Sequence, residues 1–281
     1  MTILATKNLR SLAFINRMGG KSYLTKWLCS FLPEHRLFCE PFAGGAKLLF
    51  AKEPSPVEIL NDTDNELVNL YRCIQGDGKR QMLINFLNEL PYSRSLFNHF
   101  RQTKQENDIK KAVRYFYLSK ASFAGDVGFG GFACPSRSTR RNPAMTYQNS
   151  IDALEHVAKR LRGVTIECLD YAECIRRYDS MDTLFYCDPP YLNTEDYYGK
   201  GCFALEDHYS FAELLHGIKG KVMITHYQNS LYDEVYQGWN KYTFESFKGS
   251  YKSNGESKPK TLECLYCNFE PLQTGLFNGA V

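Results

Sequence analysis

The stretch Thr183-Leu184-Phe185-Tyr186-Cys187-Asp188-Pro189-Pro190-Tyr191 is the most informative part of the chain. Its first five residues are apolar or β-forming, so they predict a buried strand. The prolines then end that strand, because neither donates an N–H to a neighbour and each fixes its φ. A carboxylate, a backbone carbonyl and an aromatic ring are therefore expected just past a sheet edge, where open α/β sheets bind ligands. A turn without a function is the alternative.

The composition allows one large domain or two small ones, since the chain has 281 residues and is 43% hydrophobic. Lysine and arginine (34) nearly balance aspartate and glutamate (31), so the net charge of +3 does not by itself indicate a polyanionic partner. A nucleic-acid partner must instead be argued from local clusters of charge.

The cysteines and the apolar runs indicate the compartment. Ten cysteines are scattered through apolar segments, which is typical of buried thiols in a reducing environment rather than of disulfides. Cys264 and Cys267 lack a second pair of ligands, so no metal is expected. No signal peptide and no run of roughly 20 apolar residues is present, which predicts a cytoplasmic, intracellular protein without a membrane segment.

Strand and helix patterns alternate at both ends of the sequence and become helical in between. Expected strands are 36–40, 57–60, 164–169, 183–187, 221–225, 242–247 and 262–269; expected helices are 22–31, 44–52, 150–161 and 172–178, with helical periodicity over about 64–119. This alternation predicts an α/β fold with a mostly parallel sheet covered on both faces. The helical block between Asp64 and Gly163 interrupts it and is interpreted as an inserted subdomain.

A glycine turn follows the first expected strand, in the run Phe38-Cys39-Glu40-Pro41-Phe42-Ala43-Gly44-Gly45-Ala46. Glycines let backbone N–H groups approach a ligand, and the helix start that follows favours negative charge. The run does not match the dinucleotide fingerprint Gly-x-Gly-x-x-Gly. Asp62 ends the next strand, where a carboxylate can accept hydrogen bonds from ribose hydroxyls. The alternative for Asp62 is to cap the helix that starts near Asp64.

The run Gly19-Gly20-Lys21-Ser22 imitates the end of a phosphate-binding loop. That loop requires a glycine where this chain has Ile15, so an ATP-dependent enzyme is disfavoured. Lys21 can still pair with a ligand carboxylate or a DNA phosphate, or it can be a solvated lysine at a helix start.

Taken together, these motifs resemble the Dam-type, D12-class DNA adenine-N6 methyltransferases, which use S-adenosylmethionine. The resemblance runs in a fixed order over nearly the whole chain: Gly19-Gly20-Lys21, the glycine turn, Asn61-Asp62, Tyr117 to Gly125, Asp188-Pro189-Pro190-Tyr191, and Glu263 to Phe269. It implies a class I methyltransferase (Rossmann-like) fold. It further implies a catalytic domain over 1–66 and 164–281 and a helical DNA target-recognition insert over 67–163.

The resemblance also implies roles for individual residues. The catalytic residues would be Asp188, Pro189, Pro190 and Tyr191. The cofactor would contact Arg17, Lys21, Glu40, Phe42, Ala43, Gly44, Gly45, Asp62, Asp170, Tyr171 and Asp188. Capping of helix 172–178 is an equal alternative for Asp170.

The chain departs from the family at two of these places. Arg17 stands where the family usually has Trp or Tyr. Residues 119–125 read Ser-Lys-Ala-Ser-Phe-Ala-Gly where the family has Asn-Arg-Thr-x-Phe-Asn-Gly, so the target sequence does not carry over from the family.

The tetrapeptide suits methyl transfer to an exocyclic amine. The amine of adenine is a poor nucleophile, because its lone pair is delocalised into the ring. The Asp188 carboxylate and the Pro189 carbonyl can hold both N6 protons and direct the lone pair at a methyl group. Tyr191 would stack on the base, which must first be flipped out of the duplex.

A basic, glycine-rich segment would contact double-stranded DNA through Lys120, Ser122, Arg137, Arg140 and Arg141. Its alternative is a solvated loop. The rival functions are methylation of RNA adenine or of cytosine N4, against which Asp188 argues because those enzymes typically have Asn or Ser there, and a DNA-binding module without catalysis. A monomer without metal is expected.

Overall fold

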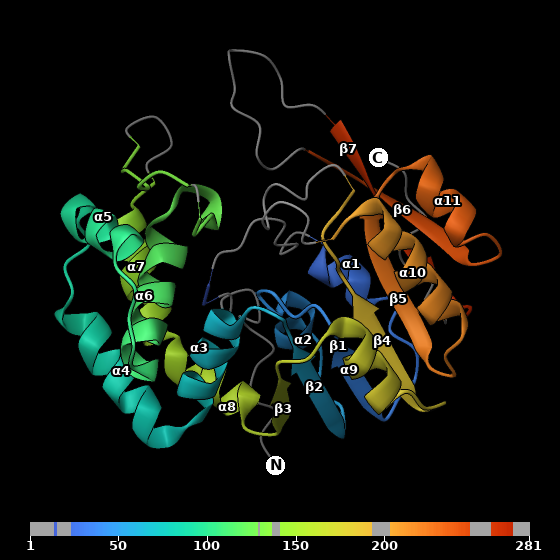
Figure 1. Cartoon of the computed structure of the whole chain (residues 1–281), viewed down its shortest axis with the longest axis horizontal. Helices are drawn as coiled ribbons and strands as arrows, with labels where there is room; N and C mark the ends of the chain where they lie inside the picture. The colour runs from blue at the N-terminus through green and yellow to red at the C-terminus, as the bar shows by residue number, and fades with distance from the viewer. Residues whose placement is uncertain are drawn as a thin grey trace. The chain divides into compact units, whose positions relative to one another are not determined.

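The computed structural model describes residues 14–15, 24–128, 130–136, 141–192, 203–247 and 260–271. Its strands are β1 (Leu37–Glu40), β2 (Val57–Asn61), β3 (Val164–Glu167), β4 (Thr183–Cys187), β5 (Lys221–Tyr227), β6 (Asn240–Phe247) and β7 (Lys260–Cys267) (Figure 1). In the described chain they form one seven-stranded sheet in the order β3-β2-β1-β4-β5-β7-β6. Strand β1 pairs in parallel with β2 and β4, and β4 with β5, whereas β7 is antiparallel to both β5 and β6. The predicted α/β class and mostly parallel sheet are confirmed.

The helices are α1 (Thr25–Cys29), α2 (Lys47–Ala51), α3 (Asn65–Gln75), α4 (Asp77–Glu89), α5 (Arg94–Gln102), α6 (Asp108–Ala121), α7 (Pro143–Asp152), α8 (Leu154–Leu161), α9 (Tyr171–Tyr178), α10 (Leu205–His216) and α11 (Ser230–Val235). A 3-10 turn covers Phe123–Gly125. Within the described ranges, no helix is long and apolar enough to cross a membrane.

Two helix predictions need correction. The expected helix 150–161 is two helices, and the first begins at Pro143 because Asn142 caps it by accepting the N–H of Met145, with proline in the first helical turn. The expected helix 44–52 has only five helical residues, since Ala46 at its start adopts the left-handed φ of 47°. A non-glycine residue rarely adopts that conformation.

The described residues divide into two compact units. One takes the chain up to Thr25, then Gly44–Glu53 and Asp62–Cys168; the other takes Lys26–Ala43, Pro54–Asn61 and the chain from Leu169 on. The predicted recognition subdomain, 67–163, falls within the first unit, and its role in recognition stays a prediction.

The second unit is built on the central strands of the sheet. On one face, Cys39, Phe185 and Val222 pack against the apolar sides of α9, α10 and α11. Figure 1 shows α9 and α10 alongside β4 and β5. Residues on the other face, such as Phe38 and Leu184, are buried as well. Strands buried on both faces are typical of parallel sheets, so the carboxyl ends of β1, β4 and β5 are held on a rigid base.

The first unit is held by a core of helices. Helix α3 buries Leu67, Leu70 and Ile74 at helical spacing, and Asp64 caps its start by accepting two backbone N–H groups. The hydroxyl of Tyr147 donates to the Leu87 carbonyl at 3.0 Å. This bond satisfies a polar group that would otherwise be costly to bury.

Candidate active site

Asp188 directly follows β4, a central strand between β1 and β5. Its carboxylate is half-buried and accepts a hydrogen bond from the hydroxyl of Thr225 on β5, with 3.2 Å between the oxygens. The hydroxyl of Tyr186 lies 3.4 Å from the same Thr225 oxygen. Pro189 is buried and Pro190 half-buried. The predicted catalytic carboxylate therefore lies at the carboxyl end of β4, where a hydrogen bond from the neighbouring strand orients it.

Tyr191 is largely enclosed by protein, with 8% of its surface exposed. Its hydroxyl donates to the carboxylate of Glu263 over 3.1 Å, and its ring meets that of Tyr227 edge-on with 4.7 Å between centroids. Burial, followed by the charges of Asp188 and Glu263, raises the pKa of Tyr191 well above its ordinary value. The hydroxyl therefore remains a donor, and stacking of this ring on a base stays a prediction.

The residue after the tetrapeptide is also held in place. The N–H of Leu192 donates to the hydroxyl of Tyr232 on α11 over 3.1 Å. The ring of Tyr232 stacks on that of His226, with 3.6 Å between centroids and 10° between planes. Thr225, Tyr232 and Glu263 were not identified as site residues from the sequence. Each lies far along the chain from Asp188; the pairing of the strands reveals the places of Thr225 and Glu263, and the packing of α11 reveals that of Tyr232.

Asn61, at the end of β2, joins two turns of the second unit. Its side-chain amide donates to the carbonyls of Pro41 and Leu169, and its oxygen accepts the N–H of Leu169. Its backbone carbonyl accepts the N–H of Ala43. The side chain is fully buried, so one asparagine fixes both the 41–43 turn and the segment that leads to Asp170. Local sequence does not indicate this role for Asn61, because its partners are distant along the chain.

Aromatic side chains pack around Phe42, in the 41–43 turn of the second unit. Phe42 and Tyr171 stack at 5.4 Å between centroids, and both contact Phe211 edge-on. Asp170, which precedes Tyr171, is exposed and accepts the N–H of Ala172. It therefore caps α9, which is the alternative role that the sequence predicts for it. Contact of Phe42, Asp170 and Tyr171 with the cofactor stays a prediction.

Glu40 ends β1 and is 2% exposed. It lies on the strand next to β4, and its charge contributes to the raised pKa of Tyr186, after burial and Asp188. Negative charge is thus concentrated at the ends of β1 and β4. A cationic group would be favoured there.

In the first unit, Asp62 shapes the glycine turn. One oxygen of its carboxylate accepts the N–H of Gly44 and the other accepts the N–H of Asp64, both at 2.9 Å. Gly44 has a φ of 48°, and its carbonyl accepts the hydroxyl of Tyr71 at 2.7 Å. The capping alternative for Asp62 is wrong, because Asp64 is the residue that caps α3. Contact of Asp62 with a ribose stays a prediction.

The predicted DNA-binding residues have different environments. Lys120 and Ser122 are buried, with 5% and 3% of their surfaces exposed, whereas Arg141 is exposed. The Ser122 hydroxyl has no hydrogen-bond partner within the described chain. Burial, and secondly the charge of Lys47, lowers the pKa of Lys120 to about 7. Arg17, Lys21, Arg137 and Arg140 lie outside the described residues.

An isolated antiparallel β-bridge pairs Ser122 with Phe132, and these two residues mark the ends of what we call the hairpin-like segment. Arg101 holds it by donating to the carbonyls of Gly128 and Gly130 at 2.7 and 3.1 Å. The ring of Phe123 is 57% exposed on this segment. An exposed aromatic ring beside basic residues is the kind of surface that contacts bases. Neither Arg101 nor Phe123 was predicted as a contact from the sequence.

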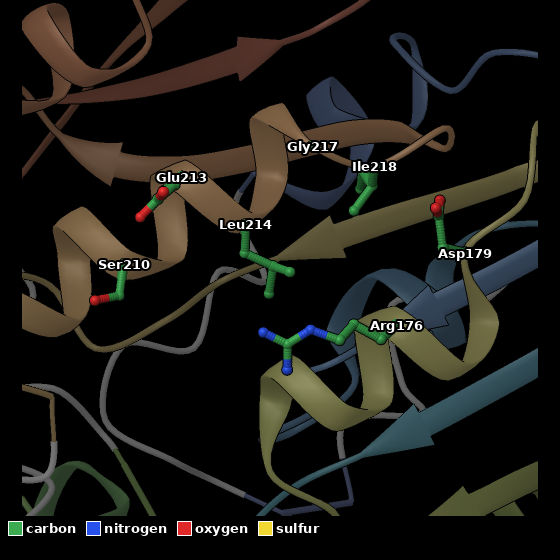
Figure 2. A pocket seen from close by; sticks show the side chains of 7 residues that line it. All are labelled: Arg176, Asp179, Ser210, Glu213, Leu214, Gly217 and Ile218. Atoms are coloured by element: carbon green, nitrogen blue, oxygen red, sulfur yellow. The ribbon is translucent and has the colours of Figure 1, made fainter.

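One cavity of the second unit lies apart from these residues. Its volume is about 570 Å³, and it is lined by Arg176, Asp179, Ser210, Glu213, Leu214, Gly217 and Ile218. Figure 2 shows that the residues from α9 and those from α10 lie on opposite sides of it. None of the predicted site residues lines it, so it is not the candidate active site. Within the described ranges, no group of three or more acidic, histidine or cysteine side chains is placed to hold a metal ion.

Comparison with known proteins agrees with this geometry. Residues 18–251 match the family model described as "D12 class N6 adenine-specific DNA methyltransferase". The chain is 27% identical to the Type II methyltransferase M.CviBI of Paramecium bursaria Chlorella virus NC1A, over 82% of this chain and 91% of that protein. It is 24% identical to the retron Ec67 DNA adenine methylase of Escherichia coli (86% and 87% covered) and 25% identical to the DNA adenine methylase of strain K12 (90% and 94%).

Proposed function

Because the chain belongs to the D12 class of N6 adenine-specific DNA methyltransferases, we propose that Asp188-Pro189-Pro190-Tyr191 is its catalytic segment. The reaction of the family is methyl transfer from S-adenosylmethionine to N6 of adenine in DNA. Membership thus sets aside RNA adenine, cytosine N4 and non-catalytic binding as alternatives. The observation that carries the proposal is the half-buried Asp188 carboxylate at the end of a central strand, fixed by Thr225.

The proposed mechanism needs two acceptors and no covalent intermediate with the enzyme. S-adenosylmethionine supplies an electrophilic methyl group. The Asp188 carboxylate and the Pro189 carbonyl would accept hydrogen bonds from the two N6–H groups, which favours a tetrahedral nitrogen with its lone pair directed at that methyl. Once the nitrogen carries the methyl group, it loses one of its two protons and becomes neutral. Asp188 also offsets the positive charge that develops on the nitrogen, and one such preorganised group contributes roughly 3–4 kcal/mol. Because Thr225 already orients the carboxylate, little reorganisation is left for the moment of reaction.

The substrate in this proposal is an adenine flipped out of duplex DNA, since the amine is inaccessible in the helix. Tyr191 forms one wall of the base pocket, and stacking on such a ring contributes about 1–3 kcal/mol per base. Its hydroxyl is held by Glu263, so the ring does not depend on the base for its orientation. The enzyme acts as a monomer inside the cell, where DNA and cofactor are both available.

The proposed cofactor contacts follow the family motifs: Arg17, Lys21, Glu40, Phe42, Ala43, Gly44, Gly45, Asp62, Asp170, Tyr171 and Asp188. Support within the second unit comes from the Phe42–Tyr171 stack and from Asn61, which fixes the adjoining turns. Support within the first unit comes from the Asp62 carboxylate, which sets the conformation of Gly44.

The proposed DNA contacts are Lys120, Ser122, Arg137, Arg140 and Arg141. Exposed Arg141 and the exposed ring of Phe123 support this assignment. Buried Lys120 and Ser122 can reach DNA only if the duplex approaches the hairpin-like segment closely. The sequence that the enzyme recognises has to be measured, because residues 119–125 depart from the family pattern.

The direct test is incubation of plasmid DNA with labelled S-adenosylmethionine, followed by base analysis and mapping of the modified sites. We expect N6-methyladenine at a defined sequence. Asp188→Ala should lower the turnover by at least about a hundredfold, because it removes a preorganised charge, while calorimetry still shows cofactor binding. Asp182→Ala, at the exposed opposite end of β4, is the matched control and should remain active. Full activity of Asp188→Ala, or label in cytosine, would contradict the proposal.

A further inference from the structure

Glu263 is a buried carboxylate that the proposed mechanism does not use. Only 2% of its surface is exposed, yet it accepts a hydrogen bond from the hydroxyl of Tyr191 at 3.1 Å. Burying a charged carboxylate is unfavourable unless hydrogen bonds compensate. An aliphatic residue would fill the same space without that cost, so a side chain that accepts a hydrogen bond here calls for an explanation.

The position of Glu263 in the sheet makes it a rigid anchor. Strand β7 lies between β5 and β6 and is antiparallel to both, with Glu263 opposite Tyr227 on one side and Phe244 on the other. A side chain on such an inner strand moves less than one on a loop. Tyr191, in contrast, follows two prolines after the end of β4 and lies outside the strands.

Tyr191 has other contacts besides Glu263, among them a side-chain hydrogen bond with Thr225 and two aromatic neighbours. Its ring lies 5.5 Å from that of His226 at 55° and meets Tyr227 edge-on. Such aromatic contacts are weaker than a hydrogen bond to a charged group. A hydrogen bond from the phenol to a charged acceptor is both stronger and more specific in direction.

We propose that Glu263 is a positioning residue for methyl transfer, and that its carboxylate holds the ring of Tyr191 in the orientation that the flipped adenine meets. This inference rests on the proposed role of Asp188-Pro189-Pro190-Tyr191. Glu263 acts through Tyr191 and does not touch the reacting atoms. Its loss therefore lowers the rate of the chemical step and leaves the affinity for the cofactor unchanged.

Kinetic coupling between the two residues tests the inference. Tyr191→Phe removes the donor and Glu263→Leu removes the acceptor, so each should lower kcat by about tenfold, the size expected for one hydrogen bond to a charged group. The double variant should be no slower than the slower single variant, because both changes break the same bond. Glu263→Gln keeps an acceptor oxygen and should recover most of kcat. Cofactor affinity by calorimetry should stay within about twofold throughout.

Matched controls are available on the same protein. Glu245→Gln removes an exposed acid from the neighbouring strand β6, and Tyr209→Phe removes an exposed phenol on α10. Both should retain wild-type kcat. Thermal unfolding of every variant establishes that it is folded at the assay temperature, and if Glu263→Leu is not, Tyr191→Phe and Glu263→Gln decide the question.

Three results would overturn the inference: an unchanged kcat in Tyr191→Phe, losses that multiply in the double variant, or no recovery in Glu263→Gln. They are distinct from a failure of the proposed function. That failure would appear as wild-type protein that makes no N6-methyladenine, or as an Asp188→Ala variant that still makes it.

Discussion

The hydroxyl of Thr225 donates to the carboxylate of Asp188, with 3.2 Å between the two oxygens. Thr225 is completely buried on β5, and the register of the two parallel strands pairs Cys187 with Ile224, one residue before each of them. The hydroxyl therefore sits on the strand next to the carboxylate, within a sheet that cannot easily shift. One oxygen of the Asp188 carboxylate accepts this bond, which restricts the orientations open to the carboxylate.

Thr225→Val should lower kcat by about tenfold, because it removes one hydrogen bond to a charged group and keeps the shape of the side chain. The affinity for the cofactor should not change. Steady-state kinetics with the mapped DNA site separate these two effects. Thr243→Val, at an exposed position of β6, is the control and should match the wild type. An unchanged kcat in Thr225→Val would mean that Asp188 needs no help in orienting.

Two glycines of the hairpin-like segment give a matched pair of variants. A Cβ at Gly130 would lie 2.6 Å from the carbonyl oxygen of Asp126, so alanine there must displace the backbone. A Cβ at Gly131 would have no atom within 4 Å. If this segment contacts DNA, Gly130→Ala should weaken DNA binding about tenfold or more, through misplaced contacts, while Gly131→Ala binds normally. Fluorescence anisotropy with a duplex measures both, and calorimetry should show unchanged cofactor binding.

Equal DNA affinity of the two glycine variants would argue against a DNA-binding role for the segment. A fall in both DNA and cofactor affinity of Gly130→Ala would indicate a wider loss of structure. Either result can be interpreted directly, because the two positions are adjacent and an added Cβ meets the backbone at Gly130 but no atom at Gly131.

The order of elements could be predicted from the sequence because it depends on local periodicity. Strand β4 was predicted with its observed bounds, since its apolar run ends at two prolines. The partners of the catalytic segment could not be predicted. Thr225 and Glu263 reach it only through the order β4-β5-β7, and neither strand order nor antiparallel register is written in local sequence.

Two further differences between expectation and structure have local causes. Asp62 and Asp64 both precede α3, and sequence alone does not tell which of two acids at this spacing is the cap. The charge of Lys120 and the glycine-rich segment after it predict a DNA contact, whereas the structure buries this lysine. Its position three and four residues after Tyr117 and Phe116 places it on the buried stripe of α6, a signal that could have been recognised.

Asp62→Ala should weaken cofactor binding by at least about tenfold, since it frees the N–H of Gly44 from its acceptor and removes the proposed ribose contact. Asp64→Ala removes the cap of α3 and should cost about 1 kcal/mol of stability with little effect on the cofactor. Calorimetry and thermal unfolding of both variants distinguish a binding carboxylate from a structural one. Equal cofactor affinities would show that Asp62 serves only the turn.

Lys120 should make stability depend on pH. Its pKa falls to about 7 in the folded protein, whereas an unfolded lysine titrates near pH ~10.4. Below both values each state is protonated, and the folded state bears the full cost of a buried charge. As the pH rises through the folded pKa, the folded state releases its proton before the unfolded one, so stability increases. Lys120→Met has no such group and should be more stable than the wild type at about pH 6, with the gain shrinking toward about pH 10.

Thermal unfolding over this pH range measures the effect, and Lys110→Met, an exposed lysine on the same helix, should show no pH-dependent gain. A destabilising lysine is retained where function requires it. Lys120→Met should therefore bind duplex DNA more weakly although it is more stable. If Lys120→Met gains stability and keeps full DNA affinity, Lys120 is not a DNA-binding residue. If the stability difference between Lys120→Met and the wild type does not vary with pH, the lysine stays charged in the folded protein.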